Sequence, residues 1–346
     1  MQWHKAALLS TLWLINNRLT MNYKYLFFAI VLSFLSACGF ASHFEKSKQD
    51  DAIIRVVPTF NPDSAYEYVK AQCDFGPRVP GSEAHAACLA YFVEQFNAFG
   101  ADTVIVQEGE SVIYDGTSMP IRNVIASYGV GKPNRVMICA HWDSRPFADN
   151  DINPANRRKP IIGANDGASG VGVILELARQ LGSQPSAMGV DLILFDLEDL
   201  GAPDWAETTL SDGGWALGSK YWASRPHVPG YQAQFAILLD MVGAQGAQFY
   251  REYFSDRYAS WVLDRVWSKA ADLGLSNVFV NQQGGAVTDD HVNVLRAGIP
   301  CIDIIQFQRD TESGFGDYWH TQNDDMRNID RATLDAVGRV LLEIIY

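Results

Sequence analysis

Three apolar runs in this chain end in histidine or aspartate, which are residue types that coordinate hard metal ions. Residues 190–199 read VDLILFDLED, residues 135–141 read RVMICAH and residues 235–240 read FAILLD. Short runs of branched and aromatic residues are typical of strands buried in a parallel sheet, and ligands gather at the carboxyl ends of such strands. One acidic pair alone would fit a solvated turn equally well. Because the pattern occurs three times, we expect His141, Asp199 and Asp240 to meet in a metal site.

Two further candidate ligands lie in loops. Asp166 is the only ionisable residue of GANDGASG (163–170), which directly precedes an apolar helical pattern, and His320 lies in YWHT (318–321). Alone, the first would be read as a flexible glycine-rich loop and the second as a surface histidine. With the three strand-end residues they form a nitrogen-and-oxygen set without cysteine, which suits Zn²⁺ with an open coordination position. Glu198 remains beside this set as a carboxylate that can move protons.

The elements that must position these residues alternate along the chain. Three extended segments come first, and helices and strands then follow by turns, which predicts a mixed sheet with an antiparallel edge and a parallel centre. The predicted strands are 102–107, 121–128, 135–140, 190–196, 235–240 and 301–306. The predicted helices are 63–72 (capped by Asp63 or Ser64), 83–99 (opened by Ser82), 170–181, 216–224, 255–271, 291–296 and 331–345. In the last helix, Leu334, Val337, Leu341 and Ile344 recur at helical spacing, which predicts core packing.

Composition limits the class of protein. The chain has 346 residues, of which 48% are hydrophobic and 19% charged, and its net charge is −13. This composition is typical of a globular protein, and one α/β domain can be this long. The negative charge argues against a nucleic-acid partner, because phosphate binding needs a basic surface.

The N-terminus has the pattern of a targeting signal. Residues 21–24 (MNYK) precede the apolar run 25–35, and LSAC follows at 35–38, so we interpret residues 1–38 as an extension and signal peptide. The LSAC string resembles a bacterial lipoprotein signal in which Cys38 is lipidated. An ordinary secretory peptide or a membrane-spanning helix is the alternative, although the run is short for spanning. We expect a tether at 39–58 and a catalytic domain at 59–346. The protein is then expected to be an exported, periplasmic lipoprotein that contacts the membrane only through its lipid anchor. Met21 is an alternative start of the chain.

The remaining four cysteines form an even number, and export would allow disulfides. Cys73 and Cys88 bracket the loop 74–87 and are the pair expected to bond if any does. Cys139 and Cys301 lie inside apolar strand-like runs, where buried free thiols are expected.

Six motifs in order resemble the zinc-dependent aminopeptidase family and, more closely, its glutaminyl cyclase branch. They are HWDSRP (141–146), GANDGASG (163–170), LEDLG (197–201), LLDMVGA (238–244), DDHVNVLRAGIP (289–300) and YWHT (318–321). The similarity runs from Phe75 to the end of the chain. It implies a single-domain α/β/α sandwich around a mixed, mostly parallel twisted sheet.

The resemblance also implies roles for individual residues. Carried over by position, the zinc ligands are Asp166, Asp199 and His320. Glu198 is the proton shuttle, with Asp240 and Asp289 as its hydrogen-bonding partners. The family usually has two glutamates at the central turn, whereas this chain has Glu198 followed by Asp199, so its second carboxylate must come closer to the metal.

The activity depends on the branch. Aminopeptidases of the family hold two zinc ions with the help of positions matching His141 and Asp240, which are present here, so a dinuclear hydrolase stays open. Three features favour the cyclase: Trp319 directly before His320, the doubled acid Asp289-Asp290 before His291, and Trp205 shortly after the acidic turn. Cyclases that this chain resembles use aromatic side chains to wall a small pocket around an N-terminal glutamine. We therefore expect one Zn²⁺, peptide or protein substrates with N-terminal glutamine, and substrate binding by Trp205, Trp319 and His141. An inactive binding module is a third alternative, disfavoured because every ligand and the base are present.

Overall fold

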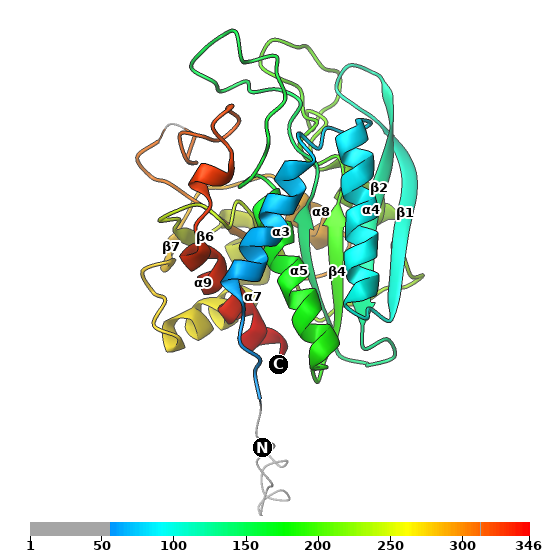
Figure 1. Ribbon diagram of the computed structural model, residues 1–346, viewed down its shortest axis with the longest axis vertical. Coiled ribbons are helices and arrows are strands. Elements are labelled where there is room, and N and C mark those ends of the chain that lie inside the picture. Colours follow the sequence, from blue (N-terminus) through cyan, green and yellow to red (C-terminus); the bar gives the residue numbers. More distant parts are fainter. Residues whose placement is uncertain (1–55, 312) are drawn as a thin grey trace, which may run out of the picture. The chain divides into compact units, whose positions relative to one another are not determined.

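The computed structural model describes residues 56–346 except residue 312, and these form one compact unit of helices and strands (Figure 1). The predicted signal, Cys38, Met21 and nearly all of the predicted tether lie outside the described residues. In the described part, no helix is both long enough and apolar enough to span a bilayer. Within the predicted tether, Val56 accepts a hydrogen bond from Gln184 and Val57 packs against the core.

A six-stranded mixed sheet forms the centre of this unit. Its spatial order is β1-β2-β4-β3-β5-β8. Strands β1 and β2 pair antiparallel, as do β2 and β4, whereas the β4-β3, β3-β5 and β5-β8 pairs are parallel. The predicted antiparallel edge and parallel centre are therefore confirmed. The strands are β1 (Thr103–Val112), β2 (Ser118–Tyr128), β3 (Arg135–His141), β4 (Gly189–Phe195), β5 (Ala236–Asp240) and β8 (Cys301–Ile305).

Helices cover both faces of the sheet because side chains alternate along each buried strand. In β3, Val136 and Ile138 belong to the larger core, whereas Met137 and Cys139 belong to the smaller one. The larger core contains side chains of α3, α4, α5, α7 and α9, and Figure 1 shows α3, α4 and α5 in front of the sheet. The smaller core contains side chains of α6 and α8. The helices are α3 (Pro62–Asp74), α4 (Glu83–Ala98), α5 (Ala168–Ser183), α6 (Leu217–Ser224), α7 (Tyr253–Asp272), α8 (Asp290–Arg296) and α9 (Arg331–Ile345).

Helix boundaries follow their capping residues. The α3 helix begins earlier than predicted, because the Asn61 side chain accepts a hydrogen bond from the Ser64 amide and Pro62 occupies the first turn. The prediction that Asp63 or Ser64 caps this helix was wrong. Ser82 caps α4 as predicted, by accepting from the His85 amide. The predicted core stripe of α9 is confirmed, since Leu334, Val337, Leu341 and Ile344 are all buried.

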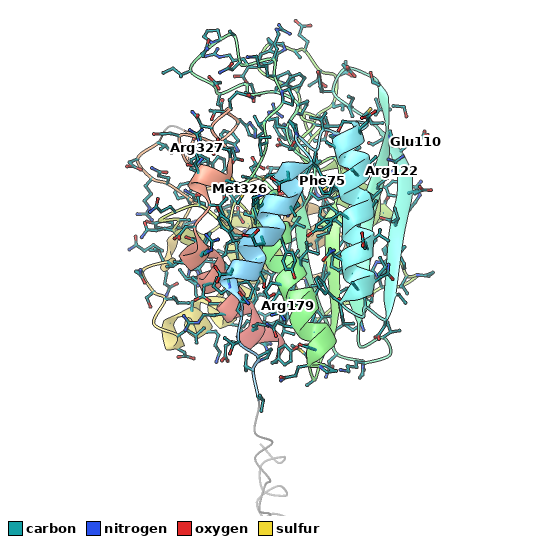
Figure 2. The ribbon with its side chains drawn as sticks, viewed as in Figure 1. Phe75, Glu110, Arg122, Arg179, Met326 and Arg327 are labelled. Carbon is teal, nitrogen blue, oxygen red and sulfur yellow. The ribbon has the colours of Figure 1, made fainter. Side chains whose placement is uncertain are left out.

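Peripheral elements complete the unit. A short parallel pair, β6 (Phe249–Arg251) and β7 (Phe279–Gln283), was not predicted, because its few residues show no clear alternation. The 3₁₀ helix η1 (Met326–Asn328) contacts α3, and Figure 2 shows Met326 and Arg327 near Phe75, which lies just after α3. On the opposite edge, Figure 2 labels Glu110 of β1 and Arg122 of β2.

All four cysteines of the described part are free thiols. Cys73 and Cys88, the pair left open as a candidate disulfide, are therefore not bonded. Burial is the main reason that the pKa of each of these two thiols is raised to about 12, while the nearby Arg78 has an opposing effect. Bracketing one loop in sequence did not bring the two sulfur atoms into a bond. Cys139 and Cys301 are buried free thiols, as predicted.

The Glu252 carboxylate is the cap of α7. It accepts hydrogen bonds from the amides of Phe254, Ser255 and Val287, and lies 3.2 Å from Nε2 of His291. Burial alone would raise the pKa of Glu252, but His291 and these backbone donors lower it to about 2. A carboxylate whose pKa is lowered by folding adds stability above its unfolded pKa, and this stability is lost as pH falls through the folded pKa.

We therefore predict that Glu252→Gln lowers the free energy of unfolding at pH 7 by about 3 kcal/mol, from a pKa difference of roughly 2.5 units. The difference from the unmodified protein should shrink between about pH 5 and pH 2. Urea unfolding at pH 7 and pH 3 measures it, with exposed Glu67→Gln as the matched control. Equal unfolding free energies for both proteins at pH 7 would contradict the assigned cap.

Candidate active site

The candidate residues meet at the carboxyl edge of the parallel strands. His141 is the last residue of β3, Asp240 is the last residue of β5, and Glu198 and Asp199 follow the end of β4 by three and four residues. The loop before α5 supplies Asp166, and His320 comes from the segment after β8. All six residues are at most 9% exposed. The sheet therefore brings together acids and imidazoles that are far apart in sequence, as predicted.

Asp166, Asp199 and His320 form a group that could hold one metal ion. One ligand atom of each lies within 4.8 Å of the others. Nε2 of His320 is 3.4 Å from an Asp199 carboxylate oxygen and 3.6 Å from an Asp166 oxygen. The second oxygen of Asp199 is buried and has no hydrogen-bond partner. Two carboxylates and an imidazole this close together, one of them with a buried unpartnered oxygen, fit a zinc ion.

The ionisation of this group reflects its crowded acids. Burial raises the pKa of Asp199, and the charge of Asp166 raises it further. Burial opposes protonation of His320, yet Asp199 and Asp149 outweigh it and raise its pKa to about 9. Surplus negative charge without a compensating cation is costly in a buried site, so a divalent cation would relieve it.

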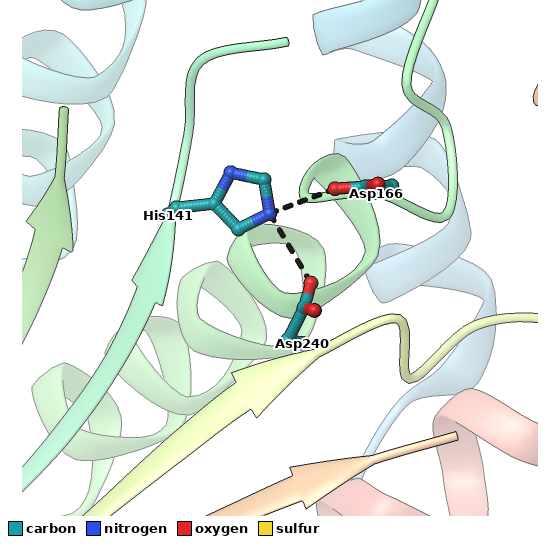
Figure 3. Close-up of side chains that lie close together, drawn as sticks. All are labelled: His141, Asp166 and Asp240. Carbon is teal, nitrogen blue, oxygen red and sulfur yellow. Dashed lines mark hydrogen bonds and ion pairs between the residues drawn. The ribbon is translucent and has the colours of Figure 1, made fainter. Parts of the chain in front are cut away.

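His141 bridges two carboxylates, Asp240 and the Asp166 that also belongs to the group described above (Figure 3). Its Nε2 atom lies 3.0 Å from an Asp166 oxygen and 3.1 Å from an Asp240 oxygen. Gly167 permits this approach, since a Cβ there would lie 2.3 Å from the same nitrogen. His141 is 1% exposed and does not line the pocket described below, so the structure does not place it against a substrate. These three residues are close enough to hold a second ion, which is the geometric basis of the dinuclear alternative.

Two buried aspartates fix the turns that carry the acidic ligands. Asp143 accepts hydrogen bonds from the backbone amides of Glu198 and Asp199, both at 3.1 Å. Asp324 accepts in the same way from the amides of Asn165 and Asp166, at 2.8 and 3.1 Å. Each carboxylate therefore orients a ligand-bearing backbone before any metal binds. Asp143 could be suspected from its place two residues after His141, whereas no local signal marked Asp324.

A pocket of about 240 Å³ opens beside the three-residue group. This volume lies just below the usual range for ligand pockets, and the walls combine apolar and aromatic side chains with a few acids. The lining residues are Asp166, Glu198, Asp199, Trp215, Asp240, Met241, Val287, Thr288, Asp289, Ile305, Phe315, Trp319 and His320. The predicted catalytic residues Glu198, Asp240 and Asp289 are all among them.

The aromatic wall differs in one position from the prediction. Trp319 lines the pocket as expected and stacks on His320, with ring centroids 3.9 Å apart. Trp205 does not line it; its ring packs on Phe147, and Arg158 lies over it at 4.8 Å. Trp215, which the sequence did not single out, takes that place in the wall. Gly201 makes room for it, because a Cβ there would lie 1.9 Å from the Trp215 ring.

The pKa of Glu198 is shifted in the direction that suits a group that both accepts and donates a proton. Burial raises its pKa well above the ordinary range, and Asp289 is the next cause. Burial and Asp240 raise the pKa of Asp289 to about 7. The predicted hydrogen bonds from Asp240 and Asp289 to Glu198 are not the bonds formed: Asp240 pairs with His141, and Asp289 accepts from the Asp290 amide. Asp289 thus acts on Glu198 through its charge.

Backbone strain is concentrated at this edge. In the described part of the chain, four non-glycine residues have left-handed φ angles: Leu197 (54°), Ala216 (52°), Met241 (49°) and His320 (54°). Leu197 precedes Glu198, Met241 follows Asp240, and the Ala216 amide donates to the Glu198 carbonyl. Such a conformation costs on the order of 1–2 kcal/mol for an L-residue. Strained backbone of this kind clusters where function requires it.

Comparison with known proteins agrees with this geometry. Residues 123–345 match the model of peptidase family M28, so the chain belongs to that family. Because its relatives include proteins named glutaminyl cyclases, it stands in the glutaminyl cyclase branch of the zinc aminopeptidase-like proteins.

Individual relatives cover most of the chain. A glutaminyl-peptide cyclotransferase of Gloydius blomhoffii is 31% identical over 76% of this chain and 75% of its own length. The crystal structure of Tannerella forsythia glutaminyl cyclase is 50% identical, with a TM-score of 0.81, and covers 84% of this chain and 99% of its own. A Zn-dependent exopeptidase of Parabacteroides distasonis is 49% identical, with a TM-score of 0.82 and the same two coverages. These likenesses confirm the predicted α/β fold.

Proposed function

We propose that this protein is a glutaminyl-peptide cyclotransferase, which converts an N-terminal glutamine into pyroglutamate and releases ammonia. The observation that carries the proposal is Glu198, a buried base in a small aromatic-walled pocket beside the Asp166, Asp199 and His320 group. The likeness to cyclases at 50% identity supports the same reaction. A pocket of this size suits one terminal residue better than a peptide segment.

The metal follows from the donor set. Asp166, Asp199 and His320 would hold one Zn²⁺, and the unpartnered Asp199 oxygen is the strongest sign of it. When bound, zinc acts as a Lewis acid on the side-chain amide carbonyl of the substrate and stabilises the charge that develops on its oxygen.

Glu198 supplies the proton transfers. The substrate's α-amine attacks the side-chain amide carbon and forms the C–N bond of the five-membered ring, while Glu198 accepts the proton that the amine loses. Glu198 then donates this proton to the amide nitrogen as the old C–N bond breaks, and ammonia leaves. No proton is gained or lost overall. The raised pKa of Glu198 makes it a competent acid for the second step.

The pocket walls provide the remaining part of catalysis. Because amine and amide belong to one molecule, the site mainly has to hold them in a folded conformation. Trp215, Trp319 and Phe315 form the aromatic part of the wall and restrict the glutamine side chain. Asp240 and Asp289 stand at the same wall and are the acids available to accept hydrogen bonds from the substrate's α-amine.

A paired assay tests the proposal. Purified protein should release ammonia from a glutaminyl dipeptide and should release no amine from a leucyl anilide, with one zinc per chain by elemental analysis. The aminopeptidase alternative predicts the opposite selectivity and two zinc ions. Release of neither product, in protein that contains zinc and is folded, would contradict both enzymatic functions.

A further inference from the structure

Arg145 occupies an unusual place beside the candidate metal group. It follows His141 by four residues, and its side chain is 1% exposed despite its charge. Its Nε donates to one Asp149 oxygen at 2.8 Å and its Nη2 donates to the other. Its Nη1 lies 3.1 Å from the Asp199 carbonyl oxygen and 3.3 Å from that of Gly201. A buried guanidinium with this many acceptors holds them in one fixed arrangement.

Two of the three candidate zinc ligands depend on this arrangement. Nη1 of Arg145 lies 3.5 Å from an Asp199 carboxylate oxygen, in addition to its bond with the backbone of that residue. The Asp149 oxygen that accepts from Nε of Arg145 lies 3.3 Å from Nδ1 of His320. The amide of Asn150, the next residue, donates to the His320 carbonyl oxygen. One side chain therefore orients Asp199 directly and His320 through Asp149.

The same guanidinium also contacts the aromatic wall. Its carbon lies 4.5 Å from the centroid of the Trp215 ring, within cation–π range. Trp215 in turn is stacked on His320, with centroids 6.1 Å apart and planes at 10°. Because Gly201 supplies both an acceptor for Arg145 and the space for Trp215, the turn after Asp199 joins the two contacts.

We propose that Arg145 is a positioning residue that ties the metal ligands Asp199 and His320 to the pocket wall at Trp215. Zinc affinity and the shape of the glutamine pocket would then depend on one buried cation. The inference rests on the proposed function for the identity of the substrate, but the link between ligands and wall is a property of this chain's own residues.

Arg145→Lys is the informative variant, because lysine keeps the charge but cannot reach Asp149, Asp199 and Trp215 from one planar group. Loss of an outer partner of a metal ligand typically costs roughly 10–100-fold in metal affinity, and we expect a loss in that range. We also expect KM for a glutaminyl dipeptide to rise by about tenfold at saturating zinc, as when a pocket wall loses its support. Competition of the metal-free protein with a chelator measures affinity, and initial rates give kcat and KM.

Arg158→Lys is the matched control. Arg158 also lies over a tryptophan, Trp205, at 4.8 Å, but it is exposed and that ring does not line the pocket. The zinc affinity and the KM of Arg158→Lys should stay within about twofold of those of the unmodified protein. Trp215→Phe separates the two halves of the link, because it should raise KM while zinc affinity stays unchanged.

The outcomes are distinct. Unchanged zinc affinity in Arg145→Lys, or lowered affinity with an unchanged KM, would overturn the proposed link. If Arg145→Lys does not fold, Asp149→Asn replaces it. That variant keeps Arg145 but weakens the contact between Asp149 and His320, so it should lower zinc affinity. Unchanged zinc affinity in Asp149→Asn would also overturn the link. If the unmodified protein releases no ammonia, the proposed function fails. The zinc affinities of the unmodified protein and of Arg145→Lys still decide whether Arg145 holds the ligands. A zinc-induced change in tryptophan emission that the unmodified protein shows, and that both Trp215→Phe and Arg145→Lys lack, decides whether Arg145 reaches the wall.

Discussion

Glu198→Gln is expected to lower kcat for a glutaminyl dipeptide by about 10³-fold, within the range that general acid–base catalysis contributes. Glutamine has nearly the same shape, so the pocket and its neighbours Asp199 and Trp215 should stay in place. It cannot accept the proton of the α-amine or return one to the leaving ammonia. Zinc content and KM should therefore remain close to those of the unmodified protein.

Ammonia release, zinc per chain and the melting temperature together test this expectation. Glu207→Gln is a suitable control, because Glu207 is an exposed glutamate of the loop that follows the same turn. Near-normal turnover by Glu198→Gln would remove Glu198 from its role as the base. A fall in zinc content would instead mean that Glu198 belongs to the metal site.

His320→Ala is expected to abolish zinc binding and, with it, ammonia release. His320 is the only nitrogen donor of its group, and Asp166 and Asp199 alone leave two oxygen donors. Losing a ligand should cost more affinity than the roughly 100-fold that losing an outer partner costs. Elemental analysis after dialysis should therefore give far less than one zinc per chain, under conditions in which the unmodified protein keeps its zinc.

A second histidine variant distinguishes one metal from two. His141→Ala should retain one zinc if Asp166, Asp199 and His320 form the only occupied group. In a dinuclear enzyme the unmodified protein would contain two ions and His141→Ala would lose one. His227→Ala, whose side chain pairs with Trp222 outside the pocket, controls for the loss of an imidazole. Full zinc content in His320→Ala would contradict the assigned ligand group.

Much of this architecture could be predicted from local patterns. A run of branched residues such as 190–195 has little alternative to a buried strand, and a parallel sheet places the ends of its strands together. That topological rule was enough to bring His141, Asp199 and Asp240 to one edge. The sheet-edge position of Asp166 followed from its place before an apolar helix, which is α5 in the structure.

The residues that were missed depend on tertiary contacts. Trp215 enters the wall because the chain between the acidic turn and α6 folds back over Gly201, whereas closeness in sequence to the acidic turn favoured Trp205. Asp324 acts through two backbone amides more than 150 positions away, so nothing near it in sequence reveals its role. The question of a Cys73–Cys88 disulfide also needed the structure, because closeness along a loop says little about whether two sulfur atoms can bond.

The left-handed residues around the site limit how this enzyme could be engineered for heat tolerance. Glycine would relieve the backbone strain at Leu197, Met241 or His320. However, Leu197 is a buried core residue, Met241 lines the pocket and His320 is a candidate ligand. Any gain in stability from relieved strain at these positions is offset by the loss of side-chain packing or of function. A library screened for melting temperature alone should therefore recover improved variants mainly from the opposite end of the sheet, and glycine variants that arise beside the pocket should be inactive.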